Sequence, residues 1–229
     1  MRVRPFTVVA LVASLVVPAA ASAMTAPVIA PPTPDSLAAS QPVFTWVLGP
    51  AGEYVSSISI STDATVDANG GLATTTNGTF LYPLQSVLTA TPTRKLAAGT
   101  YFWNAGFNAA EGQPYERGYT PVQSFRINPY VKGLVGTFTQ YNYIPALLAS
   151  GSFVSNTKTA VVTCTVRKGA VRISSQKKVL TYMTIAARNN FYCSDLTVPE
   201  RYDGQKLNLF VKVVSGGKVV STVKFFRAI

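Results

Sequence analysis

The sequence predicts an all-β protein, with two tandem β-sandwiches after a cleaved signal peptide. The first observation is an aromatic strand. Alternation along residues 101–107 places Tyr101, Trp103 and Phe107 on one face, and a packed sheet is needed to bury that much aromatic surface. The second is the aromatic segment 44–46, a partner strand upstream. The third is composition, because the chain is 48% hydrophobic and 13% charged, with many Val, Thr and Ser residues.

Short expected strands, separated by Gly, Pro and Asn turns, follow one another through the first half of the chain. They cover residues 42–48, 53–61, 78–84, 101–107 and 122–127. Such spacing without a sustained helical period is typical of a sandwich. Residues 24–41 are too proline-rich for a central strand, so we expect a linker that runs into an edge strand.

The second half shows the same pattern from residue 129 onwards. Its expected strands cover residues 133–140, 149–154, 159–166, 178–185, 191–198, 206–214 and 218–226. Ser215-Gly216-Gly217 predicts a hairpin turn between the last two, and Leu207, Leu209, Val211 and Val213 alternate on one face. The expected domains are therefore 24–128 and 129–229.

Residues 1–23 have the layout of a secretory signal. Arg2 and Arg4 precede an apolar run over residues 6–17, and Ala21-Ser22-Ala23 forms a small-residue cleavage site before Met24. No later segment approaches the length of a transmembrane helix. We expect a secreted, extracellular or cell-surface associated protein whose mature chain has no transmembrane segment.

Cys164 and Cys193 are the only cysteines. An exported chain passes through an oxidising compartment, so we expect a disulfide between neighbouring strands, with Cα atoms about 4.4 to 6.8 Å apart. A nucleophilic or redox cysteine would need a His or a Cys-x-x-Cys neighbour, and the sequence has neither.

The positive charge is concentrated in one half of the chain. Residues 24–128 contain four basic and six acidic side chains, a net charge of −2, whereas residues 129–229 contain 14 basic and three acidic ones, a net charge of +11. The basic residues expected on turns and strand ends around Cys164 are Arg167, Lys168, Arg172, Lys177, Lys178 and Arg188. They are candidate ligand-binding residues, and a solubilising surface is the open alternative.

Tyrosines form a second set of candidate binding residues. Tyr115 and Tyr119 belong to the polar segment 111–119, and Tyr141 and Tyr143 follow in the second half. Exposed aromatic rings stack on sugars or on protein partners, while packing of these loops against the interface between the domains is the alternative.

The sequence lacks the residues of the common catalytic mechanisms. The chain has no histidine, which excludes the common Ser-His-Asp and Cys-His mechanisms and removes the usual general base. One Ser-x-x-Lys frame, Ser155 to Lys158, is expected to be a solvated turn. Glu53, Glu111 and Glu116 are the candidate carboxylates of a glycosidase, but solvated charges explain them better.

Residues 63–70 loosely resemble a calcium loop. Asp63, Asp67, Asn69 and Gly70 are present, but their spacing fails the EF-hand pattern and no terminal Glu follows. A turn explains the same residues. We therefore expect no catalytic residue, no metal and no cofactor.

The residues of the first half resemble a bacterial fibronectin type III domain. The resemblance covers about residues 25–128 and is carried by Phe44-Thr45-Trp46, strand 54–60, the corner Leu96 to Tyr101, Trp103 and the closing segment 124–127. It implies that Trp46 packs in the core and that the Tyr101 hydroxyl bonds back to the loop before it. It says almost nothing of function.

The second half resembles the disulfide-bridged Ig-like sandwiches that end many exported actinobacterial proteins. Cys193, Val198-Pro199, Gly204 and the final Phe225-Phe226 carry this resemblance over about residues 158–229, although Asp195 stands where many of those domains have an aromatic residue.

Taken together, these observations predict a non-catalytic binding or spacer protein. The expected partner of its basic half is an anionic cell-wall polymer, an acidic polysaccharide or a surface protein, and no motif indicates specific nucleic-acid binding. An accessory extracellular hydrolase with an unrecognised carboxylate site is the alternative.

Overall fold

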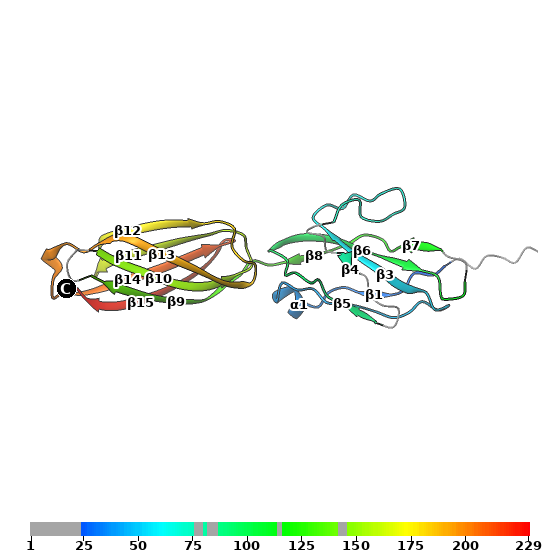
Figure 1. Ribbon diagram of the computed structural model, residues 1–229, viewed down its shortest axis with the longest axis horizontal. Helices are drawn as coiled ribbons and strands as arrows, with labels where there is room; N and C mark the ends of the chain where they lie inside the picture. The colour runs from blue at the N-terminus through cyan, green and yellow to red at the C-terminus, as the bar shows by residue number, and fades with distance from the viewer. Residues whose placement is uncertain (1–23, 76–79, 82–86, 114–115, 142–145) are drawn as a thin grey trace, which may run out of the picture.

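The computed structural model describes residues 24–75, 80–81, 87–113, 116–141 and 146–229. The signal peptide expected at residues 1–23 lies outside the described residues. The two halves of the chain lie end to end along the longest axis, joined near residues 128–130, and the C-terminus is at the far end of the second half (Figure 1).

The first half contains two antiparallel sheets. One has the order β1-β2-β5, and the other has the order β4-β3-β6-β7 with β8 also paired to β6. The strands are β1 (Ile29–Ala30), β2 (Phe44–Trp46), β3 (Tyr54–Ser61), β4 (Phe80–Leu81), β5 (Thr89–Ala90), β6 (Gly99–Asn108), β7 (Arg117–Tyr119) and β8 (Gln123–Ile127).

The second half also contains two antiparallel sheets, with the orders β13-β10-β9 and β12-β11-β14-β15. The strands are β9 (Val131–Gln140), β10 (Ala146–Ser155), β11 (Ala160–Lys168), β12 (Val171–Leu180), β13 (Ala187–Thr197), β14 (Lys206–Ser215) and β15 (Lys218–Arg227). A short 3-10 helix, Glu200–Tyr202, precedes β14.

The two halves share one strand order. In each half the first, second and fifth strands form one sheet, and the fourth, third, sixth and seventh form the other, to which the first half adds β8 beside β6. The predicted all-β sandwich fold is therefore confirmed.

The first core is built from the predicted aromatic residues. The Phe44 and Trp103 rings lie 4.9 Å apart between centroids, and Tyr101 stacks on Phe125 at 5.5 Å. Trp46 is buried in this core, as expected. The Tyr101 hydroxyl donates to the carbonyl oxygen of Ala97 at 3.0 Å, which confirms the expected bond to the preceding loop. Burial raises the pKa of Tyr101.

The second core lies between its two sheets. The alternation predicted for Leu207, Leu209, Val211 and Val213 is confirmed, since all four are buried. Because a strand turns successive side chains to opposite faces, their neighbours on β14 point away from this core.

The strand predicted at 178–185 is wrong. β12 spans Val171–Leu180, and residues 181–186 form a turn in which Tyr182 and Ala186 have positive φ angles of 58° and 51°. β12 pairs with β11 through a tight hairpin at Gly169, whose φ of 55° suits glycine. The pairing shifts register by a bulge at Val166/Arg167, just before this turn.

A helix occurs inside the segment expected to be a linker. α1 (Pro34–Ala38) begins after Thr33, whose hydroxyl accepts the backbone N–H of Ser36 at 3.4 Å, and Pro34 occupies the first turn, where its missing N–H costs nothing. The sequence prediction also missed the short strands β5 and β7.

Asn156 joins the two halves. It is fully buried, and its side-chain amide donates to the Ser40 hydroxyl at 3.1 Å and to the Asn128 carbonyl at 3.0 Å. Its side-chain oxygen accepts the N–H of Tyr130 at 2.9 Å, and its backbone carbonyl accepts the N–H of Ala98 at 2.8 Å. A buried amide satisfied from both sides restricts the angle between the halves.

Substitution Asn156→Ala should loosen this junction, because it leaves the buried Ser40 hydroxyl without its side-chain partner, at a cost of about 1–3 kcal/mol, and removes the partly buried bonds to Tyr130 and Asn128. We expect small-angle scattering to require a wider range of interdomain orientations than the unsubstituted chain does. The exposed Asn190→Ala on β13 is the control and should leave the scattering unchanged. Identical scattering of Asn156→Ala and the unsubstituted chain would show that other contacts fix the angle.

Candidate functional site

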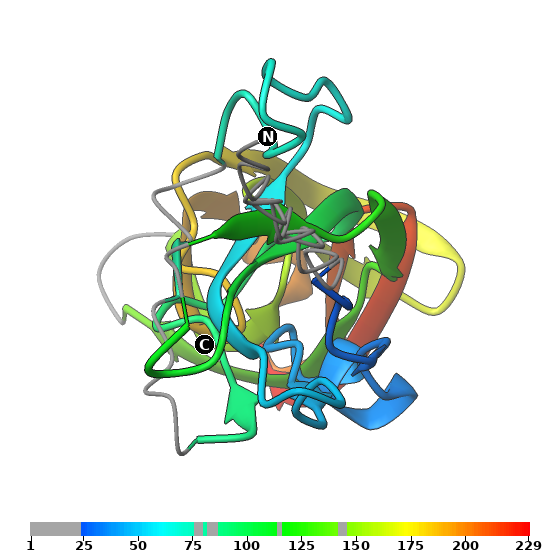
Figure 2. The ribbon, with the colours of Figure 1, turned by 90° about the vertical axis from the view of Figure 1, so that its right-hand side faces the viewer.

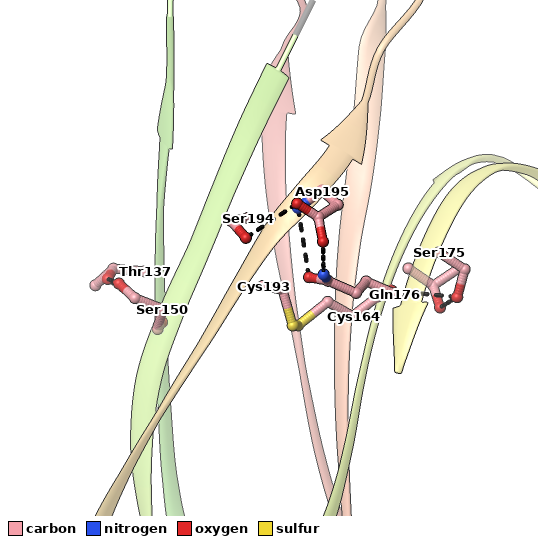
Figure 3. Close-up of a disulfide and its surroundings, with 9 residues drawn as sticks. Thr137, Ser150, Cys164, Ser175, Gln176, Cys193, Ser194 and Asp195 are labelled. Atoms are coloured by element: carbon pink, nitrogen blue, oxygen red, sulfur yellow. Dashed lines mark hydrogen bonds between the residues drawn. A yellow bond between two sulfur atoms is a disulfide. The ribbon is translucent and has the colours of Figure 1, made fainter. Parts of the chain in front are cut away.

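Cys164 and Cys193 form the predicted disulfide, with Cα atoms 6.4 Å apart, inside the expected range. Both residues are fully buried. The bond joins β11 to β13, which belong to different sheets, so it crosses the sandwich and does not join hydrogen-bonded neighbours (Figure 3). The expectation of neighbouring strands needs this correction.

A hydrogen-bonded pair, Gln176 and Asp195, links the two sheets near the disulfide. The Gln176 side chain on β12 donates to the Asp195 carboxylate on β13, and the Asp195 N–H donates back to the Gln176 side-chain oxygen at 3.4 Å (Figure 3). The Ser194 hydroxyl also donates to Asp195, at 3.1 Å. The Asp195 carboxylate is therefore engaged by β12, where the edge strands of the two sheets meet.

Replacing both cysteines, Cys164→Ala with Cys193→Ala, should destabilise the second half only. The lost constraint on a closed loop of this length is about 3–4 kcal/mol on the chain-entropy model. We expect amide hydrogen exchange to accelerate in β10, β11, β13 and β14 and to stay unchanged in β3 and β6. Equal acceleration in both halves would contradict independent stabilisation of the second core.

Three of the predicted basic residues lie on one surface. We call this the outer face, meaning the solvent side of the β12-β11-β14-β15 sheet. Arg167 on β11 is directly opposite Arg172 on β12, and Lys177 on β12 is opposite Thr163 on β11. Lys212 on β14, which the sequence analysis did not single out, lies on the other side of Thr163. The Arg167 guanidinium is 5.2 Å from the centroid of the Phe210 ring.

The other three predicted basic residues lie elsewhere. Lys178 alternates with Lys177 and is opposite the core residue Val162, and Lys168 at the hairpin end bonds to the Gln205 side chain. Arg188 lies on β13 in the other sheet. The expectation of one patch on turns and strand ends is thus corrected, because Arg172, Lys177 and Lys178 lie within β12.

Acidic side chains are absent from the strands of this sheet. β11, β12, β14 and β15 contain no Asp or Glu. Their basic residues are Arg167, Lys168, Arg172, Lys177, Lys178, Lys206, Lys212, Lys218, Lys224 and Arg227. The sheet is therefore the centre of the positive field of the chain.

The two candidate tyrosines that the structure describes, Tyr119 and Tyr141, lie in different halves of the chain. Tyr119 is half-buried on β7 beneath the Arg117 guanidinium, which lies 5.0 Å from the centroid of its ring. A side chain on Gly71 would meet the Tyr119 ring at 2.9 Å, so this ring packs under the loop after β3. Tyr141 is exposed, and Tyr115 and Tyr143 lie outside the described residues.

Glu53 is buried, which corrects the expectation of a solvated charge. Its carboxylate accepts the backbone N–H groups of Thr25 and Ala51, each at 3.0 Å. The bond from Thr25 is the main cause that lowers the pKa of Glu53, although burial acts in the opposite direction. Glu111 lines a shallow hollow with Tyr54 and Asn108, and neither Glu53 nor Glu116 is among its described lining residues.

The pH dependence of unfolding should report this buried carboxylate. Because the folded-state pKa of Glu53 is lowered, its stabilisation is complete above its usual pKa near 4.3 and is lost as the pH falls through the folded value. In urea unfolding we expect Glu53→Gln to be less stable than the unsubstituted chain near about pH 6, and the gap to narrow as the pH falls below about 4. The exposed Glu116→Gln is the control, and a gap independent of pH would contradict the assignment.

Ser155 is the last residue of β10 and is fully buried, so the expectation of a solvated turn is wrong for it. Its hydroxyl donates to the Tyr130 carbonyl at 3.1 Å and lies 2.8 Å from the Ser215 hydroxyl. Lys158 is exposed. The serine of this frame therefore holds strand ends together.

Asp63 and Asp67 stabilise turns through bonds to nearby backbone N–H groups, as expected. The Asp63 carboxylate accepts the N–H and hydroxyl of Thr65, and the Asp67 carboxylate accepts the N–H groups of Asn69 and Gly71 at 2.8 and 3.0 Å. The described ranges contain no group of three or more His, Cys, Asp or Glu side chains that could hold a metal ion. They also contain no helix long and apolar enough to cross a membrane.

The described residues define an all-β protein whose second half is crossed by a disulfide. No family model matches the chain, and no curated protein matches it. Among solved structures, the dimeric latent PorU from Porphyromonas gingivalis is similar over 83% of this chain, with 12% identity and a TM-score of 0.30. The match spans 18% of the PorU chain.

Proposed function

We propose that this chain is a non-catalytic binding or spacer protein of the cell exterior, whose second half engages an anionic partner. The observation that carries this proposal is the sheet β12-β11-β14-β15, which contains many Lys and Arg residues and no Asp or Glu. A solubilising surface usually mixes both signs of charge, and a field of one sign favours partners of the opposite sign.

The arrangement of the arginines adds to this support. Arg167 and Arg172 are directly opposite each other on paired strands, a position where like charges destabilise a sheet. No carboxylate of these strands offsets the repulsion. An anionic group that binds between the two guanidinium groups would relieve it.

The domain assignment belongs to the same proposal. Residues 24–128 form a fibronectin type III-like domain and residues 129–229 a basic, disulfide-bridged Ig-like domain. The shared strand order and the hydroxyl bond of Tyr101 to Ala97 support this assignment. A signal peptide at residues 1–23 would bring the chain to the oxidising compartment in which the disulfide forms.

Heparin chromatography of the full chain tests the anionic partner. We expect retention at low salt and elution as salt shortens the Debye length from about 10 Å at 0.1 M towards about 3 Å at 1 M. The quadruple variant Arg167→Gln, Arg172→Gln, Lys177→Gln and Lys212→Gln should elute at much lower salt.

A matched control separates the position of the charge from its amount. Lys132→Gln, Lys158→Gln, Arg188→Gln and Arg201→Gln remove the same charge from the second half, but from outside this sheet. The control should elute close to the unsubstituted chain. If the two variants elute together, the charge acts only as a net field and the proposal of a binding sheet fails.

A further inference from the structure

The outer face combines basic residues with exposed apolar ones, arranged in rows across the four strands. One row across the four strands is made of valines, Val179, Val161, Val214 and Val219, which the strand pairing places side by side. The next row is Lys177, Thr163, Lys212 and Ser221. The third is Ser175, Thr165, Phe210 and Val223, and the fourth is Arg172, Arg167, Asn208 and Phe225. On β14 the outward residues Val214, Lys212 and Phe210 alternate between apolar and basic, about 7 Å apart, and on β12 Val179 is followed by Lys177.

Several of these apolar side chains are open to solvent. Val179 is 63% exposed, Val219 is 56% exposed and Phe225 is 67% exposed. Single exposed apolar residues are ordinary, but a full row of valines across a sheet, with two phenylalanines beyond it, is a surface that favours a cover.

The first half shows how such a face is covered within one chain. The equivalent side of the β4-β3-β6-β7 sheet presents Ser57, Ser59 and Asn104, all buried. The loop after β3 returns over this side, where the Asn104 amide donates to the Gly70 carbonyl at 2.8 Å. Figure 2 shows this loop in cyan, standing out from the body of the molecule.

The second half lacks the equivalent loop. There the third and fourth strands, β11 and β12, are joined by a hairpin at Gly169. That connection is too short to fold back over the outer face, and among the described residues Val179, Val219 and Phe225 remain exposed, so we look for the cover in another molecule.

We propose that the outer face docks an acidic protein segment whose apolar and carboxylate side chains alternate in step with the outward residues of β14. The proposal rests on the anionic partner proposed above and adds its chemical class and its position. A second copy of the outer face is a poor occupant, because it would bring like charges together. The equivalent face of the first half is already covered by its own loop.

The apolar rows favour a protein over an anionic polymer. Valine side chains gain nothing from phosphate or uronate groups, since apolar burial needs an apolar counterpart. Sugar rings stack on aromatic faces, and the one largely exposed ring of this face is Phe225. Arg, aromatic and aliphatic groups together are typical of protein interfaces. Four strands and four rows span on the order of 500 Å², which predicts a weak complex.

Two synthetic peptides of equal length and charge test the inference. The valine peptide repeats Val-Ser-Glu-Ser, which places Val and Glu at every second residue, and the serine peptide has Ser in place of each Val. Titrated into the ¹⁵N-labelled full chain, the valine peptide should shift amide signals of β11, β12, β14 and β15. It should bind about tenfold more tightly than the serine peptide, because burial of a valine adds at least that factor.

Substitutions on the outer face test which residues cause the tighter binding of the valine peptide. Val179→Thr, Val219→Thr and Phe225→Ser together should abolish the tenfold difference while leaving retention on heparin unchanged. The control, Val135→Thr with Tyr192→Ser, changes exposed residues of the other sheet and should keep the difference. A dispersed amide spectrum establishes that each variant is folded.

The two proposals fail separately. Equal affinity for both peptides, or signal shifts confined to β9, β10 and β13, would overturn the protein segment even where heparin retention depends on the outer face. In that case the occupant is an anionic polymer. If the quadruple glutamine variant keeps its heparin retention, the anionic partner itself is refuted.

Discussion

Side chains alternate between the two faces of a strand, and the rest of this protein depends on how each sheet covers both of its faces. In both halves one face of each sheet packs into a core. The halves differ in the solvent-side face of one sheet. This is the β4-β3-β6-β7 sheet in the first half and the β12-β11-β14-β15 sheet in the second. In the first half the loop after β3 contacts that face at Asn104, and Ser59 and Asn104 on it are buried. In the second half it is open, although the strand order is the same.

A single connection accounts for the difference. The first half has a long stretch between β3 and β4, and residues 70 and 71 of this stretch reach the Asn104 amide and the Tyr119 ring. The second half has a tight hairpin between the corresponding strands. Loops tolerate changes of length at little entropic cost, so one topology can carry a closed sheet in one copy and an open one in the other.

Much of the fold follows from period-two patterns. The buried run Leu207 to Val213 and the aromatic strand around Trp103 were predictable because every second residue is apolar. β12 was misplaced because its residues do not alternate cleanly, and a bulge at Val166/Arg167 shifts its register. The sequence pattern does not reveal α1, because a proline-rich segment predicts a linker, whereas Pro34 stands in the first turn of a helix, where proline is tolerated.

The site was harder to predict than the fold, since it depends on strand pairing. Charge asymmetry shows which half is basic, and the cysteine pair is predictable because the sequence has only two cysteines. The sequence does not show that Arg188 lies in the opposite sheet or that Lys212 lies beside Thr163. The burial of Glu53 was equally hidden, because the N–H that holds its carboxylate belongs to Thr25, 28 residues upstream.

The disulfide and the outer face meet on the same strand. β11 carries Cys164 on its core side and Thr163 and Arg167 on its outer side. A cross-link to the facing sheet holds this strand in place, so the outer face keeps its rows of side chains in register before any partner arrives. A surface that is already ordered loses less conformational entropy on binding, and this matters most for a small interface whose gross interaction energy is modest. The opposed pair Arg167 and Arg172 costs stability in the free protein, and the cross-linked core offsets that cost.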